Sequence, residues 1–168
     1  MVKGKPTWLP SMVNVNGEWN RVVAMLYGIF DRDFRQSACF LEHTRVLWDQ
    51  TKLDASPYEE GFWHLITQRD QAMGERLFDP ERAKRLPWCR PTLENCRDPE
   101  VAVWDYQESS GKVRTYVWLE RWDYVIILEK RPRWTNPSAA FLVTAFHVGG
   151  SGTKRKLRRK QQARTSIP

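Results

Sequence analysis

Four successive segments in the C-terminal half of the chain have the composition of β-strands, and they limit the choice of fold more than any other feature. Residues 101–107 and 112–120 alternate apolar and polar side chains, whereas 123–131 and 139–148 are rich in β-branched and apolar residues. The first two are separated by the turn sequence ESSG at 108–111. Consecutive strands with short connections predict an antiparallel meander.

The N-terminal half has a helical period instead. Apolar side chains recur at helical spacing between residues 18 and 36, which predicts an amphipathic helix of about four to five turns. Asp79 followed by Pro80 predicts another helix start, because Asp is a good N-cap and proline fits the first turn. The predicted fold class is therefore α+β, with N-terminal helices packed on a C-terminal four-stranded antiparallel meander sheet and followed by a basic C-terminal tail.

A chain of 168 residues is long enough for one domain with one hydrophobic core. We divide it into an extended N-terminal arm at 1–17, a single α+β domain at 18–150 and a basic tail at 151–168. For the tail, a helical state and a disordered state both stay open.

The tail carries the whole formal net charge of +7, because it has seven basic residues and no acidic one, while the other 20 basic and 20 acidic residues balance. A run of this density attracts phosphates, and the attraction falls with salt. A solvated tail that only aids solubility is the alternative. The basic residues are Lys154, Arg155, Lys156, Arg158, Arg159, Lys160 and Arg164.

Cysteine usage, hydropathy and motifs argue against several classes of protein. Cys39, Cys89 and Cys96 are an odd number at spacings that suit neither a disulfide framework nor a zinc site. No apolar run reaches the roughly 18 residues of a membrane span, and residues 1–10 lack the apolar core of a signal peptide. We therefore expect a soluble, cytoplasmic protein with no membrane partner. Glycine-rich phosphate loops, HExxH and GxSxG are absent from the sequence, and we expect no metal and no cofactor.

Among the residues that do not belong to a known motif, the histidines are the candidates for acid–base catalysis. His64 lies inside FWHLIT, where an imidazole among large apolar groups must either be hydrogen-bonded or line a cleft. His147 lies on the last predicted strand, and His43 lies in a polar stretch that we expect at the surface. For each of them a hydrogen-bonded structural role is the alternative.

Other polar residues suggest what a histidine could do here. Lys130 ends the third predicted strand, Thr144 lies on the fourth, and Arg69 follows His64 by five residues. Such a set suits RNA cleavage by attack of the ribose 2′-OH on its own phosphate, which needs a base, an acid and cations. It needs no metal, because the nucleophile is already tethered beside the phosphorus. Ordinary surface pairing is the alternative for each cation.

The chain also resembles a known group. In order, it contains FWHLIT, RAKRLPWCRP, the strand sequence RTYVW, WDYVIILEKR, FLVTAFHV and the basic run KRKLRRK. Over residues 19–160 these motifs together resemble bacterial and phage-associated proteins grouped with the barnase, EndoU, colicin E5/D and RelE-like (BECR) nucleases. The resemblance implies the helix-then-sheet fold and a metal-independent ribonuclease, often a toxin or a protein of conflict between mobile elements and their hosts.

The same resemblance implies site residues. His64 would be the leading catalytic residue, and the basic run at 154–160 would hold the RNA. Supporting site residues would be Arg69, Arg90, Lys130 and Thr144. The stretch GGSGT at 149–153 lacks the acid–base group that often stands before the basic run in the group, so His147 is the candidate to replace it.

Two functions of different classes follow. The first is a toxin-like endoribonuclease that cleaves RNA, with tRNA as one candidate substrate and an acidic antitoxin or immunity protein as a partner. The alternative is a non-catalytic protein of a phage or mobile element that binds nucleic acid or a host complex through its basic tail and aromatic surface. The catalytic set is His64, Arg69, Lys130, Thr144 and His147. The nucleic-acid-binding set is Arg90, Lys154, Arg155, Lys156, Arg158, Arg159 and Lys160.

Overall fold

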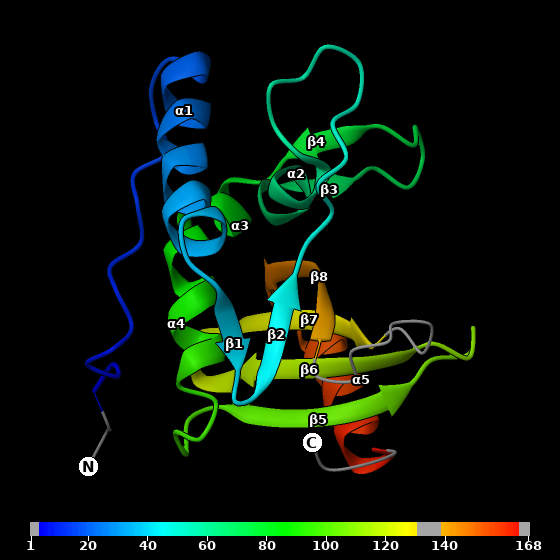
Figure 1. The fold of residues 1–168 in the computed structure, drawn as a ribbon. Helices are drawn as coiled ribbons and strands as arrows, with labels where there is room; N and C mark the ends of the chain where they lie inside the picture. The colour runs from blue at the N-terminus through cyan, green and yellow to red at the C-terminus, as the bar shows by residue number, and fades with distance from the viewer. Residues whose placement is uncertain (1–3, 131–138, 165–168) are drawn as a thin grey trace.

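The computed structural model describes residues 4–130 and 139–164 of the chain. Residues 1–3 of the predicted arm, the predicted loop at 131–138 and the last part of the tail, 165–168, lie outside the described residues. The fold is mixed α+β, with helices packed on a curled sheet (Figure 1). No helix within 4–130 and 139–164 is long and apolar enough to cross a bilayer.

Helix α1 (Trp19–Phe30) continues into a π-helical turn, Asp31–Arg35, so the helix predicted over 18–36 is confirmed. The Glu18 carboxylate accepts hydrogen bonds from the backbone N–H groups of Asn20 and Arg21, which caps the first turn of α1. One face of the helix is buried because its apolar residues follow the helical period; these are Val22, Val23, Leu26 and Phe30.

Within the described residues the main sheet has six strands, and the prediction of a four-stranded sheet is wrong. The four predicted strands are present as antiparallel neighbours, but a hairpin of two short strands extends the sheet beside β8. Because β2 runs parallel to β8, the sheet is mixed. The order is β1 (Cys39–Leu41), β2 (Thr44–Leu47), β8 (Ala139–His147), β7 (Tyr124–Lys130), β6 (Val113–Leu119) and β5 (Ala102–Gln107).

One edge of β8 contacts a strand along its first part and helices along the rest. Strand β2 pairs only with the first part of β8, at residues 139–141. Beyond that point β8 packs against the helices α2 (Glu60–Ile66) and α3 (Pro80–Lys84). Asp79 caps α3 as predicted, since its side chain accepts the N–H of Arg82. The second half of β8 and the end of α2 are therefore brought together.

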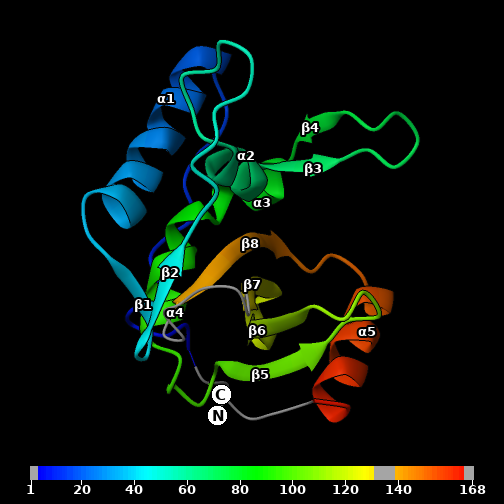
Figure 2. The same cartoon turned by 45° about the vertical axis from the view of Figure 1, so that its right-hand side comes forward.

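The two faces of the sheet carry separate apolar clusters. One face is covered by α1 and α4 (Cys89–Glu94) and forms the main core. The other face is covered by α5 (Ser151–Gln162), whose Leu157 is buried with Trp104 and Trp118. Figure 2 shows α5 across the sheet from α4. Most of the predicted tail is therefore a docked helix.

A small second sheet follows α2. Its strands β3 (Thr67–Arg69) and β4 (Arg76–Phe78) form an antiparallel hairpin that projects away from the body (Figure 2). The N-terminal arm packs along the body instead: Leu9 is buried, and the Trp88 indole donates to the carbonyl of Pro10 at 2.9 Å.

Candidate functional site

Most apolar residues of α2 are buried in the core, and the opposite face of the helix carries polar side chains. Phe62, Leu65 and Ile66 are buried, whereas Glu60 and His64 lie one helical turn apart on the partly exposed side. The start of α2 comes close to residues 48 and 49, and only a glycine fits at position 61. A Cβ there would lie 3.0 Å from both the Trp48 side chain and the carbonyl oxygen of Asp49.

The His64 ring faces a guanidinium from the projecting hairpin. Arg76 of β4 donates from Nη2 to Nε2 of His64, and the same Nη2 lies 3.2 Å from a carboxylate oxygen of Glu60. That Glu60 oxygen is 3.8 Å from His64 Nε2. Because arginine only donates, Nε2 acts as the acceptor and the ring proton of neutral His64 belongs on Nδ1. Arg69 is the cross-strand partner of Arg76.

A second arginine ties the end of α2 to β8. Arg82 of α3 donates from Nη1 to the backbone oxygen of His64 and to Oγ1 of Thr144, both at 3.0 Å. The Thr144 hydroxyl in turn donates to that same backbone oxygen at 3.1 Å. The Arg82 guanidinium also lies over the Phe146 ring, 5.5 Å from its centroid. His64, Arg82 and Thr144 thus form one cluster.

The surroundings of His64 favour its neutral form. Burial lowers the pKa of the imidazole from 6.5 to about 4, with the positive charges of Arg76, Arg69 and Arg82 acting in the same direction. The nearby carboxylate of Asp49 opposes them. At neutral pH the ring is therefore uncharged and able to accept a proton.

The structure does not bring the whole predicted catalytic set together. Thr144 joins the His64 cluster, and Arg69 acts on it through its charge. His147 pairs with Tyr124 at the end of β8, three residues beyond Thr144, so the two side chains point to opposite faces of the sheet. Lys130 lies elsewhere, on a pocket that no residue of the His64 cluster lines.

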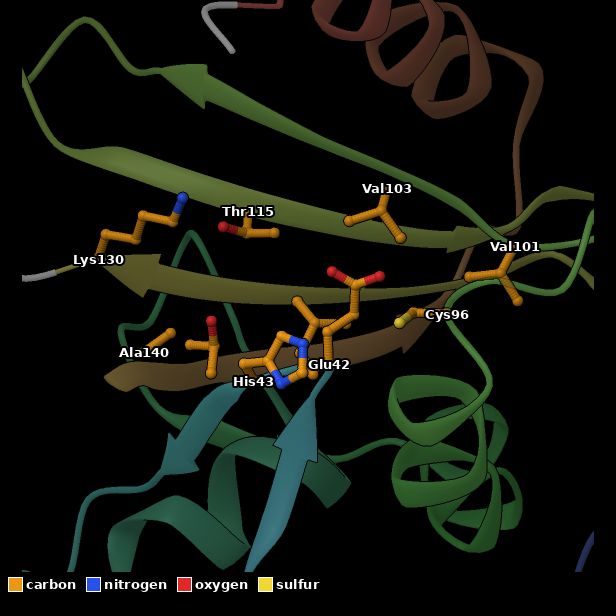
Figure 3. A pocket seen from close by; sticks show the side chains of 10 residues that line it. Glu42, His43, Cys96, Val101, Val103, Thr115, Lys130 and Ala140 are labelled. Atoms are coloured by element: carbon orange, nitrogen blue, oxygen red, sulfur yellow. The ribbon is translucent and has the colours of Figure 1, made fainter. Parts of the chain in front are cut away.

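That pocket, of about 470 Å³, lies on the core-facing side of the curled sheet (Figure 3). Its charged groups already have partners within the chain. Lys130 Nζ is 2.5 Å from the buried carboxylate of Asp105, and Glu42 accepts a hydrogen bond from Arg97 at 2.7 Å. The lining residues are Leu41, Glu42, His43, Thr44, Cys96, Val101, Val103, Thr115, Lys130 and Ala140.

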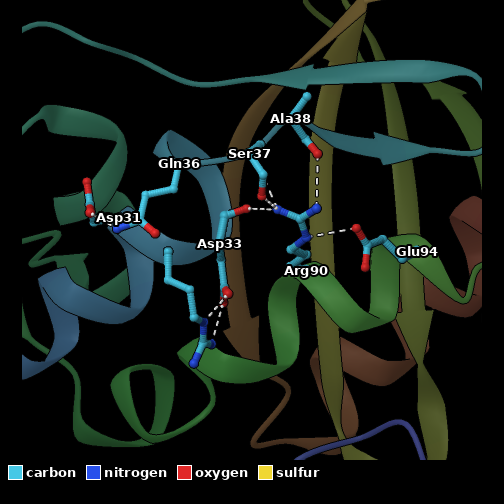
Figure 4. A network of polar contacts seen from close by, with 8 residues as sticks. Asp31, Asp33, Gln36, Ser37, Ala38, Arg90 and Glu94 are labelled. Carbon is cyan, nitrogen blue, oxygen red and sulfur yellow. Dashed lines mark hydrogen bonds and ion pairs between the residues drawn. The ribbon is translucent and has the colours of Figure 1, made fainter.

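Arg90, predicted as an RNA contact, is hydrogen-bonded to neighbouring parts of the fold (Figure 4). Its guanidinium donates to the backbone oxygens of Asp33 and Ala38, at 2.6 and 3.0 Å, and to the Ser37 hydroxyl at 2.6 Å. The Glu94 carboxylate accepts from its Nε at 2.7 Å. Arg90 therefore anchors the end of the π-helical turn to α4.

The predicted RNA-binding run divides into two sets along α5. One set holds the helix against the sheet and its loops. Lys154 lies 2.5 Å from Asp123, and Arg158 donates to Glu120. Lys160 donates to Glu108 and to the Tyr116 hydroxyl, both at 2.7 Å. The other set is exposed and without a partner in the described part of the chain; it consists of Arg155, Lys156 and Arg159. This second set lies on one outward stripe, because its spacing follows the helical turn.

Sequence reasoning missed three residues of the His64 cluster. Glu60 lies outside the apolar segment FWHLIT, and its spacing of four residues from His64 becomes informative only once the helix is known to begin at residue 60. Arg82 lies within the RAKRLPW motif but was not distinguished from its basic neighbours. Arg76 had no sequence signal, since only the hairpin of β3 and β4 returns it to α2.

Comparisons with known proteins give no match: no family model fits the sequence, no curated protein is recognisably similar to it, and no solved structure matches the fold. The BECR resemblance therefore stays a prediction. Among residues 4–130 and 139–164, no group of three or more His, Cys, Asp or Glu side chains is arranged to hold a metal ion.

Proposed function

We propose that the protein is a metal-independent endoribonuclease that cleaves RNA by attack of a ribose 2′-OH on the adjacent phosphate. The observation that carries the proposal is the placement of a neutral histidine among arginines, His64 with Arg76 and Arg82, at the meeting point of α2, the β3–β4 hairpin and β8. The reaction requires a base and a cation at one place, and in this proposal His64 is the base and Arg76 the cation.

In the proposed mechanism His64 is the base. It accepts the proton of the 2′-OH at Nε2 while the bond from the 2′-oxygen to phosphorus forms. The bond from phosphorus to the 5′-oxygen then breaks, and the leaving 5′-oxygen takes a proton from solvent. The products are a 2′,3′-cyclic phosphate and a 5′-OH end.

Arg76 must release Nε2 before His64 can act. A substrate phosphate gives the guanidinium a stronger acceptor than a neutral imidazole, because hydrogen bonds between two charged groups are shorter and about twice as strong. Arg76 would therefore move from the ring to the phosphate as RNA binds, where it stabilises the charge of the phosphorane. Arg82 and Thr144 would hold the end of α2 in place through the backbone oxygen of His64.

Helix α5 supports RNA binding at a distance from the chemistry. Its outward cations Arg155, Lys156 and Arg159 have no partner in the described chain and are available to phosphates. The helix packs on the apolar cluster that also contains Phe146, over which Arg82 lies. An acidic antitoxin or immunity protein is the partner that this cationic surface would fit.

The non-catalytic alternative has its own support. Arg76 occupies the acceptor nitrogen of His64, and the Thr144 hydroxyl is used between α2 and β8, as a purely structural cluster would require. A protein of this kind would bind nucleic acid through α5 and release no product.

The two functions are distinguished by a pair of histidine variants. His64→Gln keeps an acceptor for Arg76 but cannot take up a proton, so it should reduce the cleavage rate of single-stranded RNA or tRNA by about a hundredfold or more. His43→Gln changes an exposed histidine outside the cluster and should leave the rate unchanged. Salt-sensitive RNA binding by all three proteins without cleavage would favour the binding protein.

A further inference from the structure

A second pocket lies beside α2, between the start of α1 and the loop at 54–58. Its volume is about 380 Å³, and three of its walls are the aromatic side chains of Trp19, Tyr58 and Trp63. The other lining residues are Asn20, Val23, Asp54, Ala55, Ser56 and Pro57. None of them lines the pocket that contains Lys130.

This pocket adjoins the His64 cluster through two elements. Trp63 directly precedes His64 on α2. The Trp19 ring meets the ring of Phe78 edge-on, with 5.0 Å between centroids, and Phe78 is two residues beyond Arg76 on β4. The pocket and the His64 cluster are therefore connected through α2 and, by the contact of Trp19 with Phe78, through β4.

Trp19 lies in the first turn of α1, and 47% of its surface is exposed. An open indole face is a stacking platform, and every nucleobase has a face that can stack on it. The Asn20 amide and the Asp54 carboxylate also line the pocket, and neither side chain has a partner within the described residues. They offer acceptors to the ring and amino N–H groups of a base.

The loop that closes the pocket has a fixed shape. Asp54 and Ala55 hold left-handed backbone angles, with φ of 34° and 52°, and the turn is closed by the Ser56 N–H bonding to the oxygen of Leu53 at 2.9 Å. The Ser56 hydroxyl accepts from the Trp63 indole at 3.2 Å and donates to the oxygen of Tyr58 at 3.0 Å. Left-handed angles in non-glycine residues are uncommon and cluster at binding sites.

We propose that this pocket binds one nucleobase of the RNA strand, stacked on Trp19 and hydrogen-bonded to Asp54, beside the phosphate at His64. The inference rests on the proposed ribonuclease function and adds to it the subsite that positions the strand. Base binding in the pocket can also be measured without cleavage, so the subsite and the ribonuclease function can be refuted separately.

The binding test uses nucleoside 5′-monophosphates and the indole N–H resonances of the full-length protein. Trp19→Phe assigns the Trp19 resonance and keeps an aromatic face. Adenosine and guanosine 5′-monophosphate should shift the Trp19 resonance, whereas ribose 5-phosphate, which lacks a base, should not. No shift, or an equal shift with ribose 5-phosphate, would overturn the proposal.

The cleavage test separates this subsite from the chemistry at His64. Trp19→Ala should raise KM for single-stranded RNA by about 5- to 100-fold, the range expected for one lost stacking contact, with a smaller effect on kcat. Asparagine tolerates the left-handed backbone angles of position 54 as aspartate does, so Asp54→Asn should also raise KM without disturbing the loop. Phe40→Ala is the matched control, because Phe40 is an aromatic residue of similar exposure on β1. An unchanged KM for Trp19→Ala in an enzyme that His64→Gln inactivates would refute the subsite and leave the ribonuclease standing.

Discussion

The pKa of His64 predicts how the stability of the protein depends on pH. The folded protein holds this pKa at about 4, against 6.5 for an imidazole in water. As pH falls from about 6.5 to about 4, the unfolded chain binds a proton at this position and the folded chain does not. His64 therefore lowers the stability of the native state progressively over this window, whereas above pH 6.5 it has no such effect.

The size of the effect follows from the two pKa values. With ~1.4 kcal/mol per pKa unit, the loss at about pH 5 relative to neutral pH is about 2 kcal/mol. The His64 side chain is 26% exposed, and solvent screening reduces this figure. We expect between about 1 and 2 kcal/mol.

Urea unfolding of the wild type and of His64→Gln, near pH 7.5 and near pH 5, measures this quantity. Because glutamine does not titrate, the variant should lose about 1 to 2 kcal/mol less stability on acidification than the wild type does. His43→Gln, which changes an exposed histidine, is the control and should behave as the wild type. An equal loss in wild type and His64→Gln would refute the depressed pKa and with it a neutral His64 held by burial and arginines.

Three further predictions test other parts of the account. The acid limb of the pH profile of kcat/KM should lie near pH 4 rather than near 6.5, because the free enzyme loses its base only when His64 is protonated. Arg90→Ala should lower the free energy of unfolding by about 2 kcal/mol in urea titrations, since it leaves backbone oxygens at the end of the π-helical turn without their donor; an unchanged midpoint would contradict the anchoring role. The third change replaces Arg155, Lys156 and Arg159, the outward cations of α5, together by glutamine. It should weaken RNA binding and reduce the slope of log affinity against log salt by about 2, without loss of stability. An unchanged slope would exclude these three residues from the interface.

The main elements of the fold could be predicted because their patterns are long. The apolar period between residues 18 and 36 identified α1, and the four β segments identified β5 to β8. Strands β1 and β2 have only three and four residues, which is too short for periodicity to decide. Their place beside β8 depends on a parallel pairing between distant segments, which no local pattern indicates.

The candidate site could be predicted in part. An imidazole within an apolar segment pointed to His64, and the strand that carries Thr144 was identified. The partners of His64 could not be found in this way, because Arg76 and Arg82 reach it from a hairpin and from another helix. A basic residue in a sequence also does not indicate whether its charge is free. Arg90 and Lys160 are bonded to the fold, whereas Arg155 has no partner among residues 4–130 and 139–164.

The chemistry of the RNA ends tests the proposed function most directly. The purified full-length protein would be incubated in EDTA with end-labelled single-stranded RNA, and with the same strand carrying 2′-deoxyribose on the 5′ side of each cleaved bond. We predict fragments with 2′,3′-cyclic phosphate and 5′-OH ends, and no cleavage at the 2′-deoxy positions. Cleavage that leaves 3′-OH and 5′-phosphate ends, or that persists at the 2′-deoxy positions, would contradict attack by the 2′-OH, and intact RNA bound in a salt-sensitive way would contradict catalysis.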